Sequence, residues 1–143
     1  ITTAMCSSFK QELLGGVHDL DTHTLKIALI KSSMSGTYGA ATTNYSNVTG
    51  NSDEATGTNY SAGGQNLDSG AITLSGTTAI VDFADEVFSN LTITARGAII
   101  YNSSASNKAI AVFDFGGDVS ATSGDFTIVF PTADASNAVI RIA

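Results

Sequence analysis

Short apolar runs follow one another along the second half of the chain, and each run is bounded by Gly, Asn, Ser or Asp. The runs are rich in β-branched and aromatic residues and have the length of β-strands. Residues 71–143 are therefore predicted to form a β-rich body. The predicted strands are residues 71–74, 78–83, 91–94, 98–101, 109–115, 126–130 and 138–142.

A further strand is predicted nearer the amino terminus, over residues 24–30. Leu25, Ile27 and Leu29 occupy alternate positions there. Because alternate residues of a strand point to the same side, these three side chains would form one apolar face.

One helix is predicted, over residues 3–14. Met5, Phe9 and Leu13 are spaced four residues apart, which places them in one apolar seam on a helix. The threonines at positions 2 and 3 can cap its start, and the glycines at 15–16 can end it. We expect this packing seam to lie on a sheet, since so short a helix is marginal alone.

Residues 31–68 have a different composition, dominated by Ser, Thr, Gly and Asn without apolar periodicity. Such a length is unusual for a loop inside one compact domain, and long loops often carry function. The segment also contains Tyr38, Tyr45 and Tyr60, and interfaces favour tyrosine. We therefore predict a long polar loop excursion with these tyrosines as interface anchors; a plain surface loop is the alternative.

Together these elements predict a mainly β fold in a single domain, residues 1–143. The expected architecture is an antiparallel β-sandwich or partly open barrel of about seven to eight strands, with one N-terminal α-helix. A chain of 143 residues buries roughly 70% of its unfolded surface, which is enough for one core.

Charge limits the range of partners. Six basic and thirteen acidic residues give a net charge of −7, which would repel nucleic acid and anionic membranes. Only 13% of residues are charged, about half the usual fraction near 25%. Uncharged polar surfaces of this kind are common where copies of a protein cover one another, although a polar monomer surface is the alternative.

Targeting signals and cross-links are not evident in the sequence. No apolar run reaches the length of a membrane-spanning helix, and the amino terminus lacks the pattern of a secretory signal. A lone cysteine, Cys6, cannot form an intramolecular disulfide. We expect synthesis in the cytoplasm.

Candidate chemistry is weak. His18, Asp19, Asp21 and His23 cluster in sequence, but their spacing fits no known zinc helix and Asp is a common turn former. Cys6 falls on the helix seam, which favours packing over a nucleophilic role. No nucleophile, base and stabilising group can be assembled, so we predict no enzyme, no metal, no cofactor and no small-molecule substrate.

Arg96 interrupts an otherwise apolar stretch, residues 93–100. An arginine there should pair with a carboxylate, either within the fold or across a subunit boundary, because an unpaired buried charge is costly. Gly97 beside it predicts a bulge or a close backbone approach. Arg96 is therefore a further candidate interface residue, with an edge arginine facing solvent as the alternative.

Several motifs resemble those of a family of small, mostly uncharacterised tailed-phage proteins found in marine and freshwater phages. The resemblance covers nearly the whole chain except residues 34–54. The motifs are SFKQELL at 8–14, GVHD at 16–19, TLKIAL at 24–29, YSAGG at 60–64, LTITARGA at 91–98 and AVIRIA at 138–143.

This resemblance implies a virion structural protein that is made in the host cytoplasm, with a head decoration or cement protein as the first interpretation. Its partners would be the phage major capsid protein and further copies of itself, with a trimer favoured. Tail tube, neck or fibre-associated proteins are the second interpretation, and tube proteins would stack as hexameric rings. A carbohydrate-binding β-sandwich is the third, although the chain has no Trp for a glycan surface.

Overall fold

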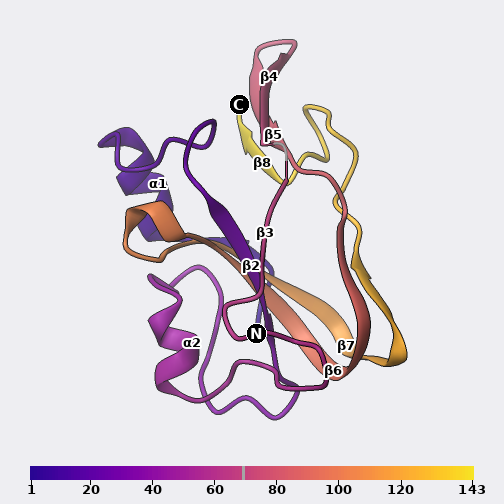
Figure 1. Cartoon of the computed structure of the whole chain (residues 1–143). Coiled ribbons are helices and arrows are strands. Elements are labelled where there is room, and N and C mark those ends of the chain that lie inside the picture. The colour runs from indigo at the N-terminus through magenta and orange to yellow at the C-terminus, as the bar shows by residue number, and fades with distance from the viewer. Residues whose placement is uncertain (69) are drawn as a thin grey trace.

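The computed structural model describes residues 1–68 and 70–143 and is mainly β, with 45% of residues in strands and 11% in helices. The described residues form two separate antiparallel sheets and no closed barrel (Figure 1). This confirms the predicted fold class and favours its sandwich-like form.

The larger sheet has five strands in the order β1-β7-β6-β2-β3. Its centre is a long hairpin of β6 and β7, closed by the 3-10 turn η1, and β2 pairs with the β6 side. Every β2 residue except the half-buried Lys26 is buried, because both faces of this strand are covered. The elements are β1 (Ala4–Met5), β2 (Leu25–Ile30), β3 (Gln65–Asn66), β6 (Glu86–Asn102), η1 (Ser103–Ala105) and β7 (Lys108–Ile128).

The smaller sheet has three strands in the order β4-β5-β8, namely β4 (Ala71–Ser75), β5 (Thr78–Asp82) and β8 (Ile140–Ile142). It lies beyond one end of the larger sheet, and the β4–β5 hairpin projects from the body (Figure 1). Phenylalanines fill the region that joins the two sheets, with Phe130 packing on Phe83 at 5.7 Å and on Phe113 at 6.5 Å between ring centroids.

The helix α1 (Ser7–Leu14) begins four residues later than predicted, because Ala4 and Met5 form β1 instead. These two residues pair with Val112 and Ala111 of β7. The predicted threonine cap is also wrong: Cys6 is the N-cap residue and makes no side-chain capping bond. The glycine ending is confirmed at Gly16, whose φ is +74°.

The predicted packing seam faces the core, although it spans two elements. Phe9 of α1 is completely buried, while Met5 of β1 and Leu13 of α1 are partly buried against the core. The helix packs on β7, so the seam does lie on a sheet.

Residues 31–68 are more structured than the predicted loop. They include the short helix α2 (Ser46–Gly50) and strand β3, which pairs with β2. Val48 of α2 is fully buried and anchors the segment. None of the helices in the described ranges is long and apolar enough to cross a membrane.

Candidate functional site

The most distinctive surface of the molecule is one side of the three-stranded sheet. Strand register aligns Ile72, Val81 and Ile140 in one row and Leu74, Ala79 and Ile142 in the next. Opposed residues of paired strands share a face, so all six apolar side chains lie on one side of the sheet. We call these six residues the apolar sheet face.

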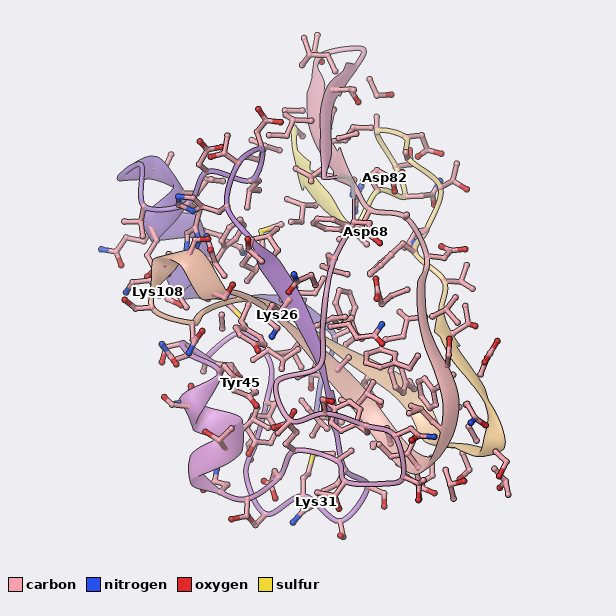
Figure 2. The ribbon with its side chains drawn as sticks, viewed as in Figure 1. Lys26, Lys31, Tyr45, Asp68, Asp82 and Lys108 are labelled. Carbon is pink, nitrogen blue, oxygen red and sulfur yellow. The ribbon has the colours of Figure 1, made fainter. Side chains whose placement is uncertain are left out.

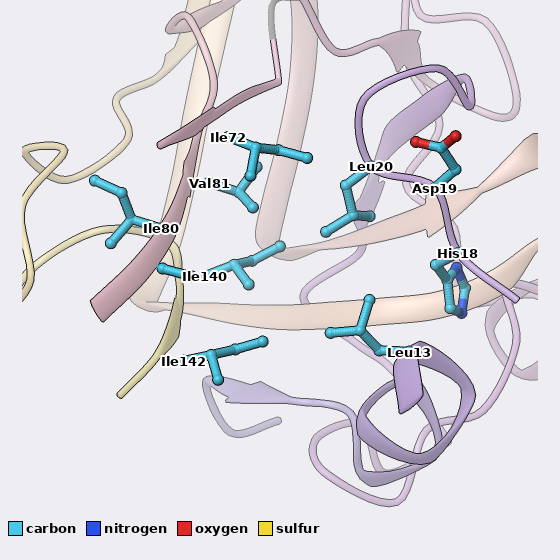
Figure 3. A pocket seen from close by; sticks show the side chains of 10 residues that line it. Leu13, His18, Asp19, Leu20, Ile72, Ile80, Val81, Ile140 and Ile142 are labelled. Carbon is cyan, nitrogen blue, oxygen red and sulfur yellow. The ribbon is translucent and has the colours of Figure 1, made fainter. Parts of the chain in front are cut away.

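Part of this face is covered by the body of the protein. Figure 3 shows Ile72, Val81 and Ile140 pointing toward Leu13 and Leu20, with Ile80 pointing away. A cavity of about 290 Å³ remains between the two sides. Its lining is Leu13, His18, Asp19, Leu20, Ile72, Ala79, Ile80, Val81, Ile140 and Ile142.

The outer part of the face is uncovered. Val81 and Ile140 are buried, whereas Ile72, Leu74 and Ile142 are exposed by 51%, 74% and 52%. Single exposed apolar residues are ordinary, but a contiguous exposed group is typical of a contact surface. This face can therefore bind another apolar surface.

The tyrosines predicted as interface anchors have partners inside the fold. Tyr60 donates a hydrogen bond to Glu54 Oε1 over 2.8 Å, and Tyr45 donates to Glu54 Oε2. The Tyr45 ring stacks on Tyr101 at 4.4 Å between centroids. Burial, with the nearby Glu54 carboxylate, raises the pKa of the Tyr45 and Tyr60 hydroxyls, so both stay protonated donors.

Tyr38 is only 2% exposed, so it is a core residue and the prediction of an accessible anchor is wrong for it. Its hydroxyl donates to Asp53 Oδ2 over 2.7 Å. The burial of Tyr38 is not evident from the sequence, because its neighbours are polar. Its hydroxyl can be buried because it is hydrogen-bonded to a buried carboxylate. The excursion tyrosines thus organise residues 31–68, and Tyr45 lies beside α2 (Figure 2).

Asp53 is the most completely buried carboxylate in the described ranges. Burial opposes its ionisation, but hydrogen bonds from Tyr38, the amides of Gly36 and Ser35, and Lys31 outweigh that effect. The net result is a pKa well below the usual range for an aspartate, so Asp53 is ionised at neutral pH.

The two histidines of the sequence cluster meet around Asn102, not around a metal. Asn102 Nδ2 lies 3.0 Å from His18 Nδ1 and 2.9 Å from His23 Nδ1. Asn102 is fully buried at the end of β6, and the amide donates to both rings if each presents an unprotonated Nδ1. Within the described ranges, no group of three His, Cys, Asp or Glu side chains could hold a metal ion.

The same cluster extends to α1 through Glu12. His18 Nε2 lies 3.5 Å from Glu12 Oε1, and Lys108 Nζ lies 2.9 Å from Glu12 Oε2. Burial lowers the pKa of His18, although Glu12 acts in the opposite direction. These contacts tie α1 to the start of β7 and give the cluster a structural role.

Cys6 is fully buried, and burial together with Glu12 raises the pKa of its thiol to about 11. A thiol of this kind stays protonated and is a poor nucleophile. The packing role predicted from its place beside the helix seam agrees with this environment.

Arg96 pairs within the fold. Its Nε lies 3.1 Å from Asp114 Oδ1 on β7, and the register of β6 and β7 shifts between Ala95 and Gly97. Both the carboxylate partner and the bulge were predicted. A Cβ on Gly97 would lie 2.2 Å from the Phe113 carbonyl oxygen, which explains why the bulge contains glycine.

Comparison with known protein families, with curated proteins and with solved structures found no match to this chain. The candidate site therefore rests on the residues themselves, and the resemblance to phage structural proteins stays a prediction. The apolar sheet face was not recognised from sequence. Its signal was the apolar alternation of Ile72 with Leu74, Ala79 with Val81 and Ile140 with Ile142.

Proposed function

We propose that this chain is a non-enzymatic structural protein of a bacteriophage virion, which decorates the outer surface of the head as a cement protein. The observation that carries the proposal is the apolar sheet face, with Ile72, Leu74 and Ile142 exposed on a projecting sheet. Burying apolar surface contributes about 25 cal/mol per Å². The motif resemblance supports the phage capsid protein as the partner.

The proposed mechanism is mass action. A protein that binds the assembled lattice, but not its dissociated subunits, stabilises the lattice by an amount that grows with its concentration relative to Kd. A folded body with one projecting apolar sheet suits this role. Each copy would make modest contacts, and the stabilisation from many copies would add up across a symmetric shell.

Copy number in purified phage particles tests the function. Quantitative mass spectrometry would compare this chain with the major capsid protein. A ratio near one, or a sizeable fraction of it, is the expected result for a decoration protein. A far smaller ratio would overturn head decoration in favour of the tail or neck, and absence from the particles would overturn the virion assignment.

The contact surface has its own test. Ile142→Asp places a charge on the apolar sheet face, and burying an unpaired charge is costly. We expect this variant to bind particles at least about tenfold more weakly, a difference of roughly 1.4 kcal/mol. Val129→Asp is the matched control, because Val129 is 71% exposed and lies outside this face. Equal binding of both variants would remove the face from the interface.

A further inference from the structure

Strand β4 forms an open edge of the three-stranded sheet. It pairs with β5 on one side, and no other strand in residues 1–68 and 70–143 lies on its opposite side. Its first four residues are exposed and Ser75 is half-buried. An edge of this kind presents backbone donors and acceptors that can pair with another strand.

The hairpin turn indicates which backbone groups point outward. Ser75 pairs with Thr78 across a two-residue turn, and Gly76 in that turn has φ of +62°. In such hairpins the closing pair exchanges both hydrogen bonds, and the pattern alternates along the strand. The N–H and C=O groups of Ile72 and Leu74 therefore point away from β5.

Protein edges are usually protected by charge, proline or a bulge. Residues 70–81 contain no charged residue and no proline, and the β4–β5 register is uninterrupted. The nearest charges in sequence, Asp68 and Asp82, lie at the base of the hairpin (Figure 2). Two copies of this chain, each with a net charge of −7, can therefore meet here without bringing like charges into contact.

We propose that β4 pairs antiparallel with β4 of a second copy, about a two-fold axis that passes between the two Thr73 residues. Ile72 then lies opposite Leu74 of the second copy, and Leu74 lies opposite the second copy's Ile72. This register engages all the outward backbone groups of both residues in hydrogen bonds. It also joins the two apolar sheet faces into one continuous face on a six-stranded sheet.

A second copy fits this edge better than an unrelated extended peptide. The contact is self-complementary, since each strand supplies the same donors, acceptors and apolar side chains that it meets, as a two-fold interface requires. Five residues per strand make a contact smaller than stable specific interfaces, which usually bury about 1,200–2,000 Å². The pairing should therefore be a concentration-dependent dimer, in contrast to the trimer that the sequence resemblance favours.

Cross-linking tests the register. Thr73 and its copy would be a non-hydrogen-bonded pair with Cα atoms about 4.5 Å apart, within reach of a disulfide. With oxidised glutathione as the oxidant, Thr73→Cys is expected to give a covalent dimer. Ser75→Cys is the matched control, because its two copies would be about 13 Å apart, and it should stay monomeric. The native Cys6 is buried and does not compete.

A mixture of the Ala71→Cys and Ser75→Cys variants is a second test of the register, because this register places Ala71 opposite Ser75 of the second copy. A covalent heterodimer is expected. Failure of both Thr73→Cys and the mixture to cross-link would overturn the proposed pairing.

Sedimentation velocity tests the association itself. The weight-average sedimentation coefficient of the unmodified chain should rise with concentration, up to about 1 mM, toward that of a dimer. Leu74→Pro removes an outward N–H, and Leu74→Lys adds an edge charge, so each should weaken the dimer about tenfold or more. Val129→Lys should dimerise like the unmodified chain.

A monomer at every concentration, or an oligomer that the Leu74 variants leave unchanged, would overturn the inference. It does not depend on the proposed phage function. If the chain dimerises but is absent from particles, the β4 pairing is supported and the phage function is overturned. If the chain is monomeric but present in high copy number on the head, the phage function is supported and the β4 pairing is overturned.

Discussion

At the scale of single residues, buried charge explains how a polar segment becomes part of a folded body. Residues 31–68 lack the apolar periodicity that usually indicates a core, yet Asp53 is completely buried there. It accepts hydrogen bonds from Tyr38 and from the amides of Ser35 and Gly36, and Lys31 Nζ lies 3.3 Å from Oδ1. A buried ionised carboxylate persists only with such partners.

Asp53→Asn should therefore destabilise the protein by about 2 kcal/mol or more, because an amide cannot accept from all these donors. The midpoint of urea unfolding at pH 7 measures this. The exposed Asp118→Asn is the matched control and should unfold like the unmodified chain. If both variants unfold at the same midpoint, the Asp53 cluster is not what holds residues 31–68.

The acid dependence follows from the lowered pKa of Asp53. Its contribution to stability is fully present above the ordinary value of 3.8 and is lost as pH falls from there toward the folded-state value. The difference in unfolding free energy between the unmodified chain and Asp53→Asn should therefore be smaller at pH 3 than at pH 7. Urea titrations at the two pH values give this comparison.

The pKa of His18 is also lowered, but here the fold favours the neutral form of a base and not the charged form of an acid. As with Asp53, stability should fall as the pH falls. Burial lowers its pKa below the ordinary 6.5, so the folded state binds a proton less readily than the unfolded chain. Stability from neutral His18 is present above 6.5 and is lost as pH falls through the window below it. His18→Gln should flatten the fall in urea midpoint between pH 7.5 and 5, as roughly one titrating group is removed. An unchanged fall in the His18→Gln variant would contradict this role of His18.

At the scale of elements, local pattern predicted which segments form structure and long-range pairing decided where they end. The seam of Met5, Phe9 and Leu13 identified the apolar positions, but Met5 belongs to β1 because it pairs with β7 more than a hundred residues away. The predicted runs 91–94 and 98–101 belong to one strand, β6, which continues through the bulge at Arg96. A single sequence contains no direct signal for such pairings.

The same limit applies to the candidate site. Arg96 was predicted to find a carboxylate, and its partner is Asp114 on the neighbouring strand. The roles of Asn102 and Glu54 were missed, since each is surrounded by groups distant in sequence. Tyr38 was assigned to a surface because tyrosine is common at interfaces, whereas its hydrogen bond to Asp53 lets it occupy the core.

Helix α1 offers a buried and an exposed apolar residue for comparison. Phe9 is completely buried and packs on His18 at 5.0 Å between ring centroids, whereas Leu14 is 92% exposed. Phe9→Ala should cost about 3–5 kcal/mol of unfolding free energy, because it leaves a cavity in a close-packed core. Leu14→Ala should change it by less than about 0.5 kcal/mol. Urea unfolding followed by circular dichroism measures both, and similar costs would contradict the placement of the seam.

At the scale of the whole molecule, the core and the exposed apolar face belong to different sheets. The long hairpin of β6 and β7, with β2 beside it, holds most of the core, while the three-stranded sheet extends an apolar face from one end (Figure 1). The polar groups with shifted pKa values described above stabilise the body. The projecting sheet is therefore the surface that we propose for contact with another molecule.

The proposed role on a phage head leads to a prediction at this scale. Particles that lack the protein should release their genome at a lower temperature than complete particles, because a ligand of the assembled lattice stabilises it by RT ln(1 + [L]/Kd). Adding back the purified chain should restore the release temperature in a concentration-dependent way, which dye binding to released DNA can follow. Ile142→Asp should require about tenfold more protein for the same recovery, whereas Val129→Asp should match the unmodified chain. Equal release temperatures with and without the protein would show that its presence on the particle does not stabilise the shell.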